Sequence, residues 1–315
     1  MTAFRCNKGV FLKSTILILT IAVFARAQSI VQQPPPPPGP QKPPSQIQEN
    51  DAKIIKNLIY DPAGHERNKL DLYLPAKPSD KSFPLIVWIH GGAWLGGSKE
   101  NPPARKFVAL GFAVASINYR LSQHAIFPAQ IEDCKAAIRY LRANAKTYNL
   151  DPARIGVWGA SAGGHLVAML GTTGDDKSFD KGPNLEQSSA VQAVCDFFGP
   201  TDFTKMSAFP STMNHDAPDA PEAKLVGGPV QEKKEACRLA NPITYITRKD
   251  PPFLIVHGDK DPLVPHNQSE LLRDALKAAG VETTLYTVPG GGHGGFKDPK
   301  VDVLVAEFFN KHLRK

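Results

Sequence analysis

The chain has 315 residues, of which 42% are hydrophobic and 21% are charged, and its formal net charge is +7. This composition is that of an ordinary globular protein. It excludes a disordered chain, a collagen-like repeat, a coiled coil and a membrane protein with several spans. The chain is long enough to bury a large single core.

Residues 1–27 have the pattern of a secretory signal peptide. Basic residues precede an apolar run from Ser14 to Ala25, which is short for a membrane span, and Ala25-Arg26-Ala27 fits a cleavage site. An uncleaved anchor is the alternative. Cleavage would reduce the 37 basic residues to 33 against 30 acidic ones, a net charge of +3. We therefore expect a secreted or periplasmic protein without membrane contact after cleavage. No basic run is interleaved with aromatic residues, which argues against nucleic-acid binding.

Residues 28–49 are rich in proline and favour an extended polyproline II conformation. We interpret them as a stiff linker that precedes a catalytic domain at residues 50–315. A docking peptide for a proline-binding partner is the alternative.

The cysteines are compatible with one disulfide, because export permits oxidation. Cys134 lies in a helical apolar stripe from Ile131 to Leu141, which predicts a buried thiol. Cys195 and Cys237 remain as the expected disulfide pair. No C-x-x-C motif is present, and the histidines lack metal-ligand spacing, so the sequence predicts no metal site.

Short apolar runs alternate with helical patterns from about residue 50 onward, which predicts an α/β fold with a mostly parallel sheet and helices on both faces. The expected strands are 70–74, 83–90, 112–117, 154–158, 191–198, 253–256 and 284–288. The expected helices are 128–147, 161–171, 268–279 and 301–309. Residues 172–190 and 200–240 are polar and rich in glycine and proline, and we expect loops or small helices over the top edge of the sheet.

The expected strand at 83–90 ends in His90-Gly91-Gly92-Ala93-Trp94. A Gly-Gly turn exposes backbone N–H groups, which a serine that transfers acyl groups needs for the developing oxyanion. The candidate donors are the N–H groups of Gly92 or Ala93, together with that of Ala162. We interpret His90 as a structural hydrogen-bonding residue. Trp94 is predicted to be either a core aromatic or a substrate-binding wall.

The next motif is Gly159-Ala160-Ser161-Ala162-Gly163, directly after an expected strand and directly before an expected helix. In this context G-x-S-x-G predicts a sharp turn that exposes the hydroxyl of Ser161 as a nucleophile. The helix that follows also favours developing negative charge at its N-terminus. The alternative is a tight turn with an ordinary serine.

Two later loops supply a candidate acid and a candidate base. Asp261 follows the strand at 253–256, and His293 lies in a glycine-rich loop after the strand at 284–288. A histidine can take the proton of Ser161, and an acid can orient that histidine. Asp259 is the rival acid, and Asp202 is a weaker third candidate.

Gly290, Gly292 and Gly295 spell G-x-G-x-x-G, but too few residues follow to complete a dinucleotide-binding unit. The sequence therefore predicts no cofactor. We expect His165, one helical turn after Ser161, to pack in the helix and to bond a neighbouring loop.

Together these motifs resemble the α/β-hydrolase fold enzymes, above all bacterial feruloyl and acetylxylan esterases and carboxylesterases related to hormone-sensitive lipase. The matching stretches are 90–94, 118–121, 127–133, 159–164 and 259–265. The resemblance implies a Ser161-His293-Asp261 triad in an α/β-hydrolase fold. Relatives of hormone-sensitive lipase usually carry His-Gly-Gly-Gly and Gly-Asp-Ser-Ala-Gly, whereas this chain has Ala93 and Ala160. That departure favours the feruloyl esterase branch and the kynurenine-formamidase-like hydrolases.

The resemblance implies hydrolysis of short acyl or feruloyl esters, either small molecules or esters of plant polysaccharide. The alternatives are a serine peptidase of the prolyl-oligopeptidase type, a kynurenine-formamidase-like amidase and a hydrolase-fold binding protein without activity. Peptidases of that type usually carry an upstream propeller domain, for which this sequence leaves little room. A binding protein usually lacks a triad member, and all three are present here.

Overall fold

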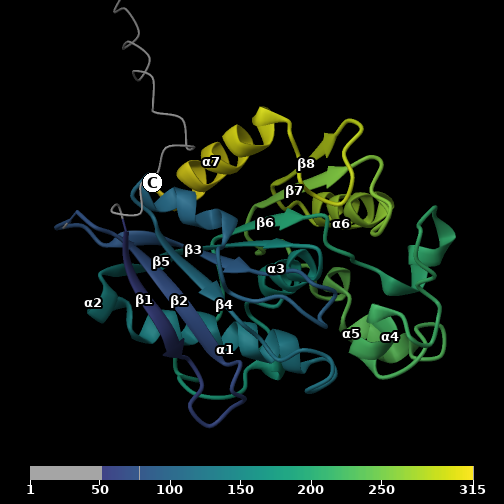
Figure 1. Ribbon diagram of the computed structural model, residues 1–315, viewed down its shortest axis with the longest axis horizontal. Helices are drawn as coiled ribbons and strands as arrows, with labels where there is room; N and C mark the ends of the chain where they lie inside the picture. Colours follow the sequence, from purple (N-terminus) through teal and green to yellow (C-terminus); the bar gives the residue numbers. More distant parts are fainter. Residues whose placement is uncertain (1–51, 78, 315) are drawn as a thin grey trace, which may run out of the picture. The chain divides into compact units, whose positions relative to one another are not determined.

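The computed structural model describes residues 52–77 and 79–314, which form an eight-stranded sheet with helices on both faces (Figure 1). The expected signal peptide and linker lie outside the described residues. The strands are β1 (Ala52–Ile59), β2 (Lys69–Pro75), β3 (Phe83–Ile89), β4 (Ala113–Ile117), β5 (Leu150–Ala160), β6 (Ala193–Phe197), β7 (Phe253–Gly258) and β8 (Thr283–Val288). Their order in the sheet is β1-β2-β4-β3-β5-β6-β7-β8. β2 pairs antiparallel with β1 and β4, and all other pairs are parallel, which confirms the predicted fold class.

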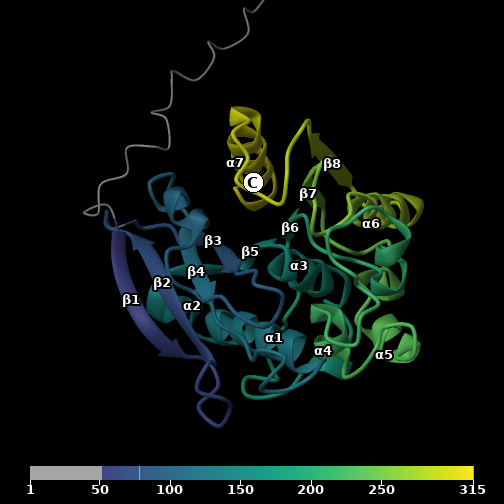
Figure 2. The same ribbon diagram turned by 45° about the vertical axis from the view of Figure 1, so that its right-hand side comes forward.

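Two helical layers enclose this sheet. The α-helices are α1 (Ala129–Ala143), α2 (Ala145–Tyr148), α3 (Ala162–Thr172), α4 (Pro221–Val226), α5 (Lys234–Leu239), α6 (Asn267–Ala278) and α7 (Pro299–Leu313). The 3-10 helices are η3 (Pro103–Val108), η4 (Lys177–Phe179), η5 (Phe203–Ala208) and η6 (Pro242–Tyr245). Figure 2 shows α7 and α1 on opposite sides of the sheet, as Figure 1 does. Within residues 52–77 and 79–314, none of the helices has the length and the apolar character that crossing a membrane requires.

The central strands are apolar on both faces because each face is covered. In β3, Val87 packs into the cluster shared with α1 and α3, whereas its neighbour Trp88 packs into the cluster shared with η3 and α7. Successive residues of a strand point to opposite faces, so a strand buried on both sides reads as a continuous apolar run. This arrangement explains why such runs predicted the parallel strands.

The sequence pattern missed β1. Its apolar residues do not alternate, because the pairing with β2 shifts between Ile55 and Leu58, where Asn57 has a φ of 58°. β1 is also an edge strand, and most of its residues are exposed or only partly buried. An irregular edge strand has little of the period-two apolar signal that identifies a strand in a sequence.

The prediction that residues 172–190 lie over the top edge of the sheet is wrong. α3 begins at the carboxyl end of β5, and the chain must return to the amino ends of the strands before the parallel β6 begins. Residues 172–190 therefore connect the end of α3 to the amino end of β6, and between these points they pack against Lys135 and Arg139 of α1. Residues 200–240 follow the carboxyl end of β6 and contain η5, α4 and α5, as predicted.

The expected disulfide between Cys195 and Cys237 is also wrong. Cys134, Cys195 and Cys237 are all free and buried. Cys195 points from β6 into the cluster beside α7, whereas Cys237 on α5 belongs to the cluster on the other face. The sheet thus separates the two sulfur atoms. Cys134 is a buried thiol in the apolar face of α1, as predicted.

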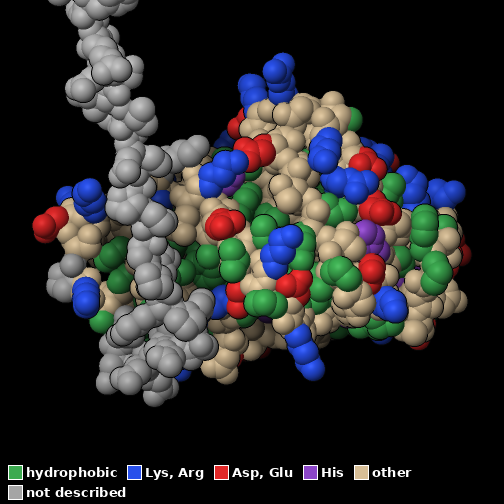
Figure 3. Space-filling view, turned by 90° about the horizontal axis from the view of Figure 1, so that it is seen from above, with side chains coloured by type: hydrophobic (Ala, Val, Ile, Leu, Met, Phe, Trp, Pro, Cys, Tyr) green, Lys and Arg blue, Asp and Glu red, His purple; other side chains and the backbone are tan. Residues whose placement is uncertain are grey.

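Charges on the face drawn in Figure 3 are mixed. Lys and Arg side chains are interspersed with Asp and Glu over the part of this face that grey atoms leave visible. The basic residues of this face therefore do not gather into one patch there.

A buried ionic cluster holds the segment 172–190 against α1. Lys135 and Arg139 are fully buried, and their charged ends lie 3.2 Å and 3.1 Å from Oδ1 of Asp180. Burial lowers the pKa of Lys135, and the Asp180 carboxylate opposes this effect. Ser189 also donates to Asp180, at 3.1 Å. One carboxylate therefore compensates two cations that water does not reach.

Asp180→Ala is expected to lower the free energy of unfolding by about 3–5 kcal/mol, because it leaves two buried cations without their carboxylate. Urea denaturation followed by circular dichroism measures this loss. Asp175→Ala is the control, because Asp175 is exposed on the same segment and its loss should cost less than about 0.5 kcal/mol. Equal effects of the two substitutions would contradict the role of the cluster.

Candidate active site

Ser161 lies in the sharp turn between β5, which ends at Ala160, and α3, which begins at Ala162. Its backbone has a φ of 56° and a ψ of −121°, which is a rarely populated conformation for a residue with a side chain. Its N–H donates to the carbonyl of Phe197 at 2.8 Å, which ties the turn to β6. The side chain is partly exposed. The strand, turn and helix are thus arranged as the motif predicted.

Two glycines allow the close approach that this turn requires. A Cβ on Gly163 would lie 2.1 Å from the carbonyl oxygen of Ile89, and a Cβ on Gly159 would lie 2.2 Å from that of Gly163. Either side chain would push α3 away from the strand ends. The spacing G-x-S-x-G therefore lets α3 begin directly against β3 and β5, with the serine at the turn.

His293 and Asp261 complete a hydrogen-bonded chain with Ser161. Nε2 of His293 lies 3.0 Å from Oγ of Ser161, and Nδ1 of His293 lies 2.7 Å from Oδ2 of Asp261. A neutral imidazole that donates from Nδ1 to the carboxylate has a free lone pair on Nε2 for the serine proton. The three residues come from the loops after β5, β7 and β8, whose carboxyl ends share one edge of the sheet. The structure therefore brings the three predicted residues together.

The carboxylate of Asp261 receives several donors. Its Oδ1 accepts the N–H groups of Leu263 and Val264 at 2.8 Å and 3.0 Å, and its Oδ2 also lies 3.1 Å from Nε2 of His257. Burial raises the pKa of Asp261, but the hydrogen bonds from His257 and His293 outweigh burial and hold the pKa well below its usual range. Asp261 is therefore a carboxylate near neutral pH.

The two rival acids have other partners. Asp259 accepts the N–H of Gly290 at 2.6 Å and so holds the loop that carries His293. Asp202 accepts the N–H of Thr204 at 3.2 Å and pairs with Lys205 at 3.1 Å. Of the three candidates, Asp261 has the hydrogen bond to His293.

The loop after β3 lies against the serine and supplies candidate oxyanion donors. A Cβ on Gly91 would be 3.2 Å from Cβ of Ser161, so the two turns are in contact. Gly92 and Ala93 have left-handed φ values of 103° and 54°, and within residues 52–77 and 79–314 their N–H groups have no recorded acceptor. Ala162 is the first residue of α3, where an N–H has no partner within the helix. Their role as oxyanion donors stays a prediction.

Trp94 is not a wall of the substrate site, so that interpretation is wrong. Its side chain is only 1% exposed. The indole packs edge-on against His165 and Phe203, with ring centroids 5.3 Å and 5.5 Å away. Phe203 comes from the segment after β6, whose position the sequence around Trp94 does not reveal. Trp94 is therefore a core residue beneath the candidate oxyanion loop.

His90 and His165 are buried structural residues, as predicted. Burial lowers the pKa of each to about 4, so both are neutral near pH 7. His165 contacts the carbonyl of Ala240 at 2.6 Å. His90 stacks on Tyr119 and contacts the guanidinium of Arg67 at 3.3 Å. Arg67 also donates to the carbonyl of Gly97 at 3.0 Å, so it braces the candidate oxyanion loop, and no sequence motif marked it.

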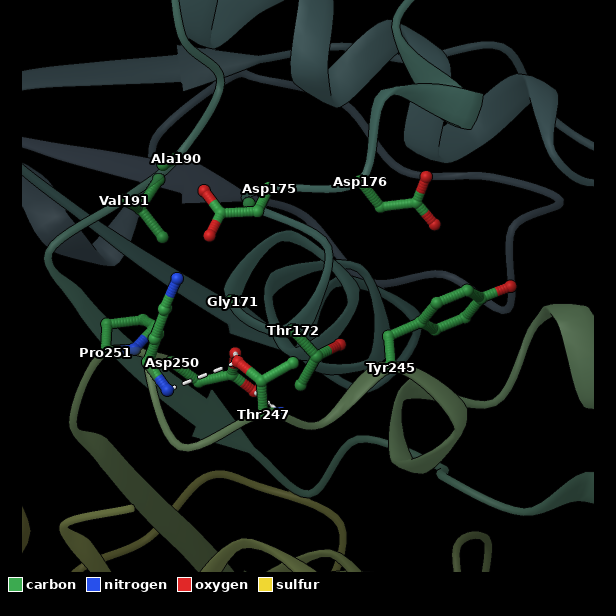
Figure 4. Close-up of a pocket in the computed structure, with 12 residues that line it drawn as sticks. Gly171, Thr172, Asp175, Asp176, Ala190, Val191, Tyr245, Thr247, Asp250 and Pro251 are labelled. Carbon is green, nitrogen blue, oxygen red and sulfur yellow. Dashed lines mark hydrogen bonds between the residues drawn. The ribbon is translucent and has the colours of Figure 1, made fainter. Parts of the chain in front are cut away.

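Two cavities open against elements that also carry site residues, one at the end of α3 and one beside the loop after β7. Figure 4 shows the first, of about 240 Å³, which is lined by Thr172 at the far end of α3 and by Asp175, Asp250 and Tyr245. It lies at the opposite end of the 11-residue helix α3 from Ser161, so it is remote from the triad. The second, of about 570 Å³, opens beside the loop of Asp261 and is lined by Phe209, prolines and charged side chains.

The fold and this site define an α/β-hydrolase of the esterase group. The BD-FAE family model matches residues 70–276, and the chain belongs to that family. Its fold resembles a truncated form of a carbohydrate esterase from gut microbiota with a TM-score of 0.77 and 37% sequence identity, over 85% of this chain and 99% of that one. It also resembles a bifunctional GH43-CE protein of Bacteroides eggerthii with a TM-score of 0.76 and 38% identity, over 84% of this chain and 38% of that one.

Esterases of known sequence are also similar. Esterase LipQ of Mycobacterium tuberculosis is 32% identical over 250 residues, which are 78% of this chain and 58% of that protein. Carboxylesterase NlhH of the same species is 31% identical over 71% of this chain and 69% of its own length. The chain thus spans little more than half the length of LipQ.

Proposed function

We propose that this protein is a secreted serine carboxylic ester hydrolase that acts on short acyl or feruloyl esters of plant polysaccharide. The single observation that carries the proposal is the hydrogen-bonded chain from Ser161 through His293 to Asp261, at 3.0 Å and 2.7 Å. Membership of the BD-FAE family and the similarity to esterases support the same reaction class.

The proposed reaction has two halves. Oγ of Ser161 attacks the ester carbonyl carbon while Nε2 of His293 takes the hydroxyl proton. The carbonyl oxygen becomes an oxyanion, which the N–H groups of Ala162 and of Gly92 or Ala93 stabilise. The ester C–O bond then breaks, and the imidazolium returns the proton to the leaving alcohol. A water molecule then attacks the acyl-enzyme while His293 takes its proton, and the imidazolium returns that proton to Oγ of Ser161 as the acyl C–O bond breaks and the carboxylic acid leaves.

The expected substrate is inferred from the family similarity and from a cavity that Asp261 lines but Ser161 and His293 do not. The cavity of about 570 Å³ beside the Asp261 loop is open to solvent and has both apolar and charged lining residues, among them Phe209, Lys260 and Glu270. Phe209 is 45% exposed, and an exposed aromatic face suits a sugar or a cinnamoyl ring. Charged lining residues disfavour a long alkyl chain. The similar carbohydrate esterase supports a carbohydrate ester, and export suits a polymer outside the cell.

Acetyl and feruloyl esters are expected to exceed octanoyl and longer esters at least about tenfold in kcat/KM. The measurement compares p-nitrophenyl acetate, methyl ferulate, acetylated xylan and p-nitrophenyl octanoate on residues 28–315. Ser161→Ala on each substrate gives the background. N-formylkynurenine and a peptide amide test the two rival activities. A preference for long acyl chains would contradict the polysaccharide proposal, and faster cleavage of either amide would reassign the activity.

A further inference from the structure

His257 is a buried histidine to which the mechanism above assigns no step. It is fully buried and directly precedes Gly258, the last residue of β7. Its Nε2 lies 3.1 Å from Oδ2 of Asp261 and 3.0 Å from the carbonyl oxygen of Val264. Oδ2 is the oxygen that also accepts from His293, so the two histidines share one carboxylate oxygen.

The partners of His257 determine which nitrogen carries its proton. Nε2 faces two oxygen atoms, a carboxylate and a backbone carbonyl, neither of which can donate a proton. The proton must therefore be on Nε2, which donates to both. Nδ1 lies 2.7 Å from the hydroxyl of Ser269, which can donate to it. The ring is then a neutral donor held in one orientation by Ser269.

We propose that His257 is a positioning residue of the triad, which fixes Oδ2 of Asp261 and withdraws negative charge from it. The inference rests on the proposed function. A carboxylate that already accepts a hydrogen bond from His257 attracts the imidazolium form of His293 less strongly. His257 therefore lowers the pH at which His293 becomes a competent base.

Few other titratable groups face this pair. The ring of His266 lies 5.3 Å from that of His257 and is itself held by Thr287 at 2.9 Å and Glu270 at 3.6 Å. Asp259 binds the backbone of the His293 loop. The apolar ring of Phe198 packs beside both histidines, 4.6 Å from His293 and 6.2 Å from His257. The carboxylate of Asp261 is the group that contacts both histidines directly.

His215 offers a matched control. It is also buried, with 1% exposure, and its Nε2 lies 3.0 Å from the carbonyl of Leu263 in the same loop. It pairs with Glu222 at 3.3 Å and contacts Ser211 at 3.1 Å, so its polar contacts within the described residues are with groups other than Asp261. Substitution of His215 therefore loosens the acid loop without removing a donor from the carboxylate.

The test measures kcat and kcat/KM for p-nitrophenyl acetate from pH 4.5 to 8.5 in the exported protein. The wild-type rate is expected to rise between about pH 5 and 7, as catalysis by a histidine base generally requires. In His257→Phe the acid limb, which is the rising low-pH part of the pH–rate profile, should move to higher pH by about 0.5 unit. The reason is that Asp261 has lost a hydrogen-bond donor. Its kcat at the plateau should fall about tenfold because Asp261 is less well held.

Three further variants separate the causes. His257→Gln places an amide N–H near the position of Nε2 and should restore most of the limb position. Ser269→Ala removes the hydroxyl that holds Nδ1 of His257, and it should move the acid limb to higher pH by less than His257→Phe does. It also tests the role of His257 if His257→Phe does not fold. His215→Gln should lower the melting temperature without moving the limb.

An unchanged limb in both His257→Phe and Ser269→Ala would overturn the inference, as would an equal shift in His215→Gln. The proposed function fails separately. If the wild-type protein hydrolyses the ester no faster than Ser161→Ala does, the esterase assignment itself is wrong. If that activity is present and the limb does not respond to His257, only the positioning role is wrong.

Discussion

Ser161→Ala is expected to lower kcat for p-nitrophenyl acetate by about 10⁴- to 10⁶-fold, because the nucleophile and its base act as one unit. His293→Ala should be about as severe, since Nε2 of His293 is the group that lies 3.0 Å from the serine oxygen. The residual activity would come from the candidate oxyanion donors and substrate binding alone. Steady-state kinetics under identical conditions measures both losses.

The serine variant also needs evidence of an intact fold. A far-ultraviolet circular dichroism spectrum and a melting temperature like those of the wild type provide it. Ser79→Ala, an exposed serine between β2 and β3, is the matched control and should retain full activity. A phosphonate ester should label the wild-type protein at Ser161 and should not label Ser161→Ala, as measured by peptide mass spectrometry. More than a tenth of wild-type activity in Ser161→Ala would exclude it as the nucleophile.

Asp261→Asn is expected to lower kcat by about 10³- to 10⁴-fold. The amide can present an N–H group to Nδ1 of His293, which favours the tautomer that has its proton on Nε2. That tautomer cannot accept the proton of Ser161. The loss should appear in kcat more than in KM, because the carboxylate stabilises the imidazolium that forms during the reaction.

Asp259→Asn is the comparison that tests whether Asp261 or Asp259 is the acid of the triad. Asn retains a carbonyl oxygen that can accept the N–H of Gly290, so the His293 loop should stay in place. We expect its kcat to fall less than about tenfold, which is the scale of one weakened hydrogen bond. Loss of activity in Asp259→Asn with retention in Asp261→Asn would show that Asp259 is the acid.

The predictions that the structure agrees with concern features encoded within a few adjacent residues. The turn around Ser161 follows from two glycines and a serine between a strand and a helix, because backbone sterics act over neighbouring residues. The parallel strands are recognisable because a strand covered on both faces must be apolar throughout. The position of His293 and Asp261 after successive strands places them at one edge of a parallel sheet.

The predictions that failed concern contacts between distant segments. The pairing of Cys195 with Cys237 was inferred by excluding Cys134, but the direction of each side chain relative to the sheet decides whether sulfurs can meet. Trp94 is covered by Phe203, which lies more than a hundred positions further along the chain. Neither residue's neighbours in the sequence carry information about what covers it.

His257 and Asp259 show most clearly the difference between what adjacent residues encode and what only the folded chain sets. Both lie within four positions of Asp261, and the spacing of residues alone does not reveal which carboxylate meets His293 or which histidine braces it. The tight turn after β7 directs Asp261 inward to His293 and His257, and it leaves Asp259 to bind Gly290. Local chemistry therefore determined the class of site and its candidate nucleophile. The packing of loops at the strand ends decided which acid and which buried histidine complete it, because hydrogen bonds require distances that only the folded chain sets.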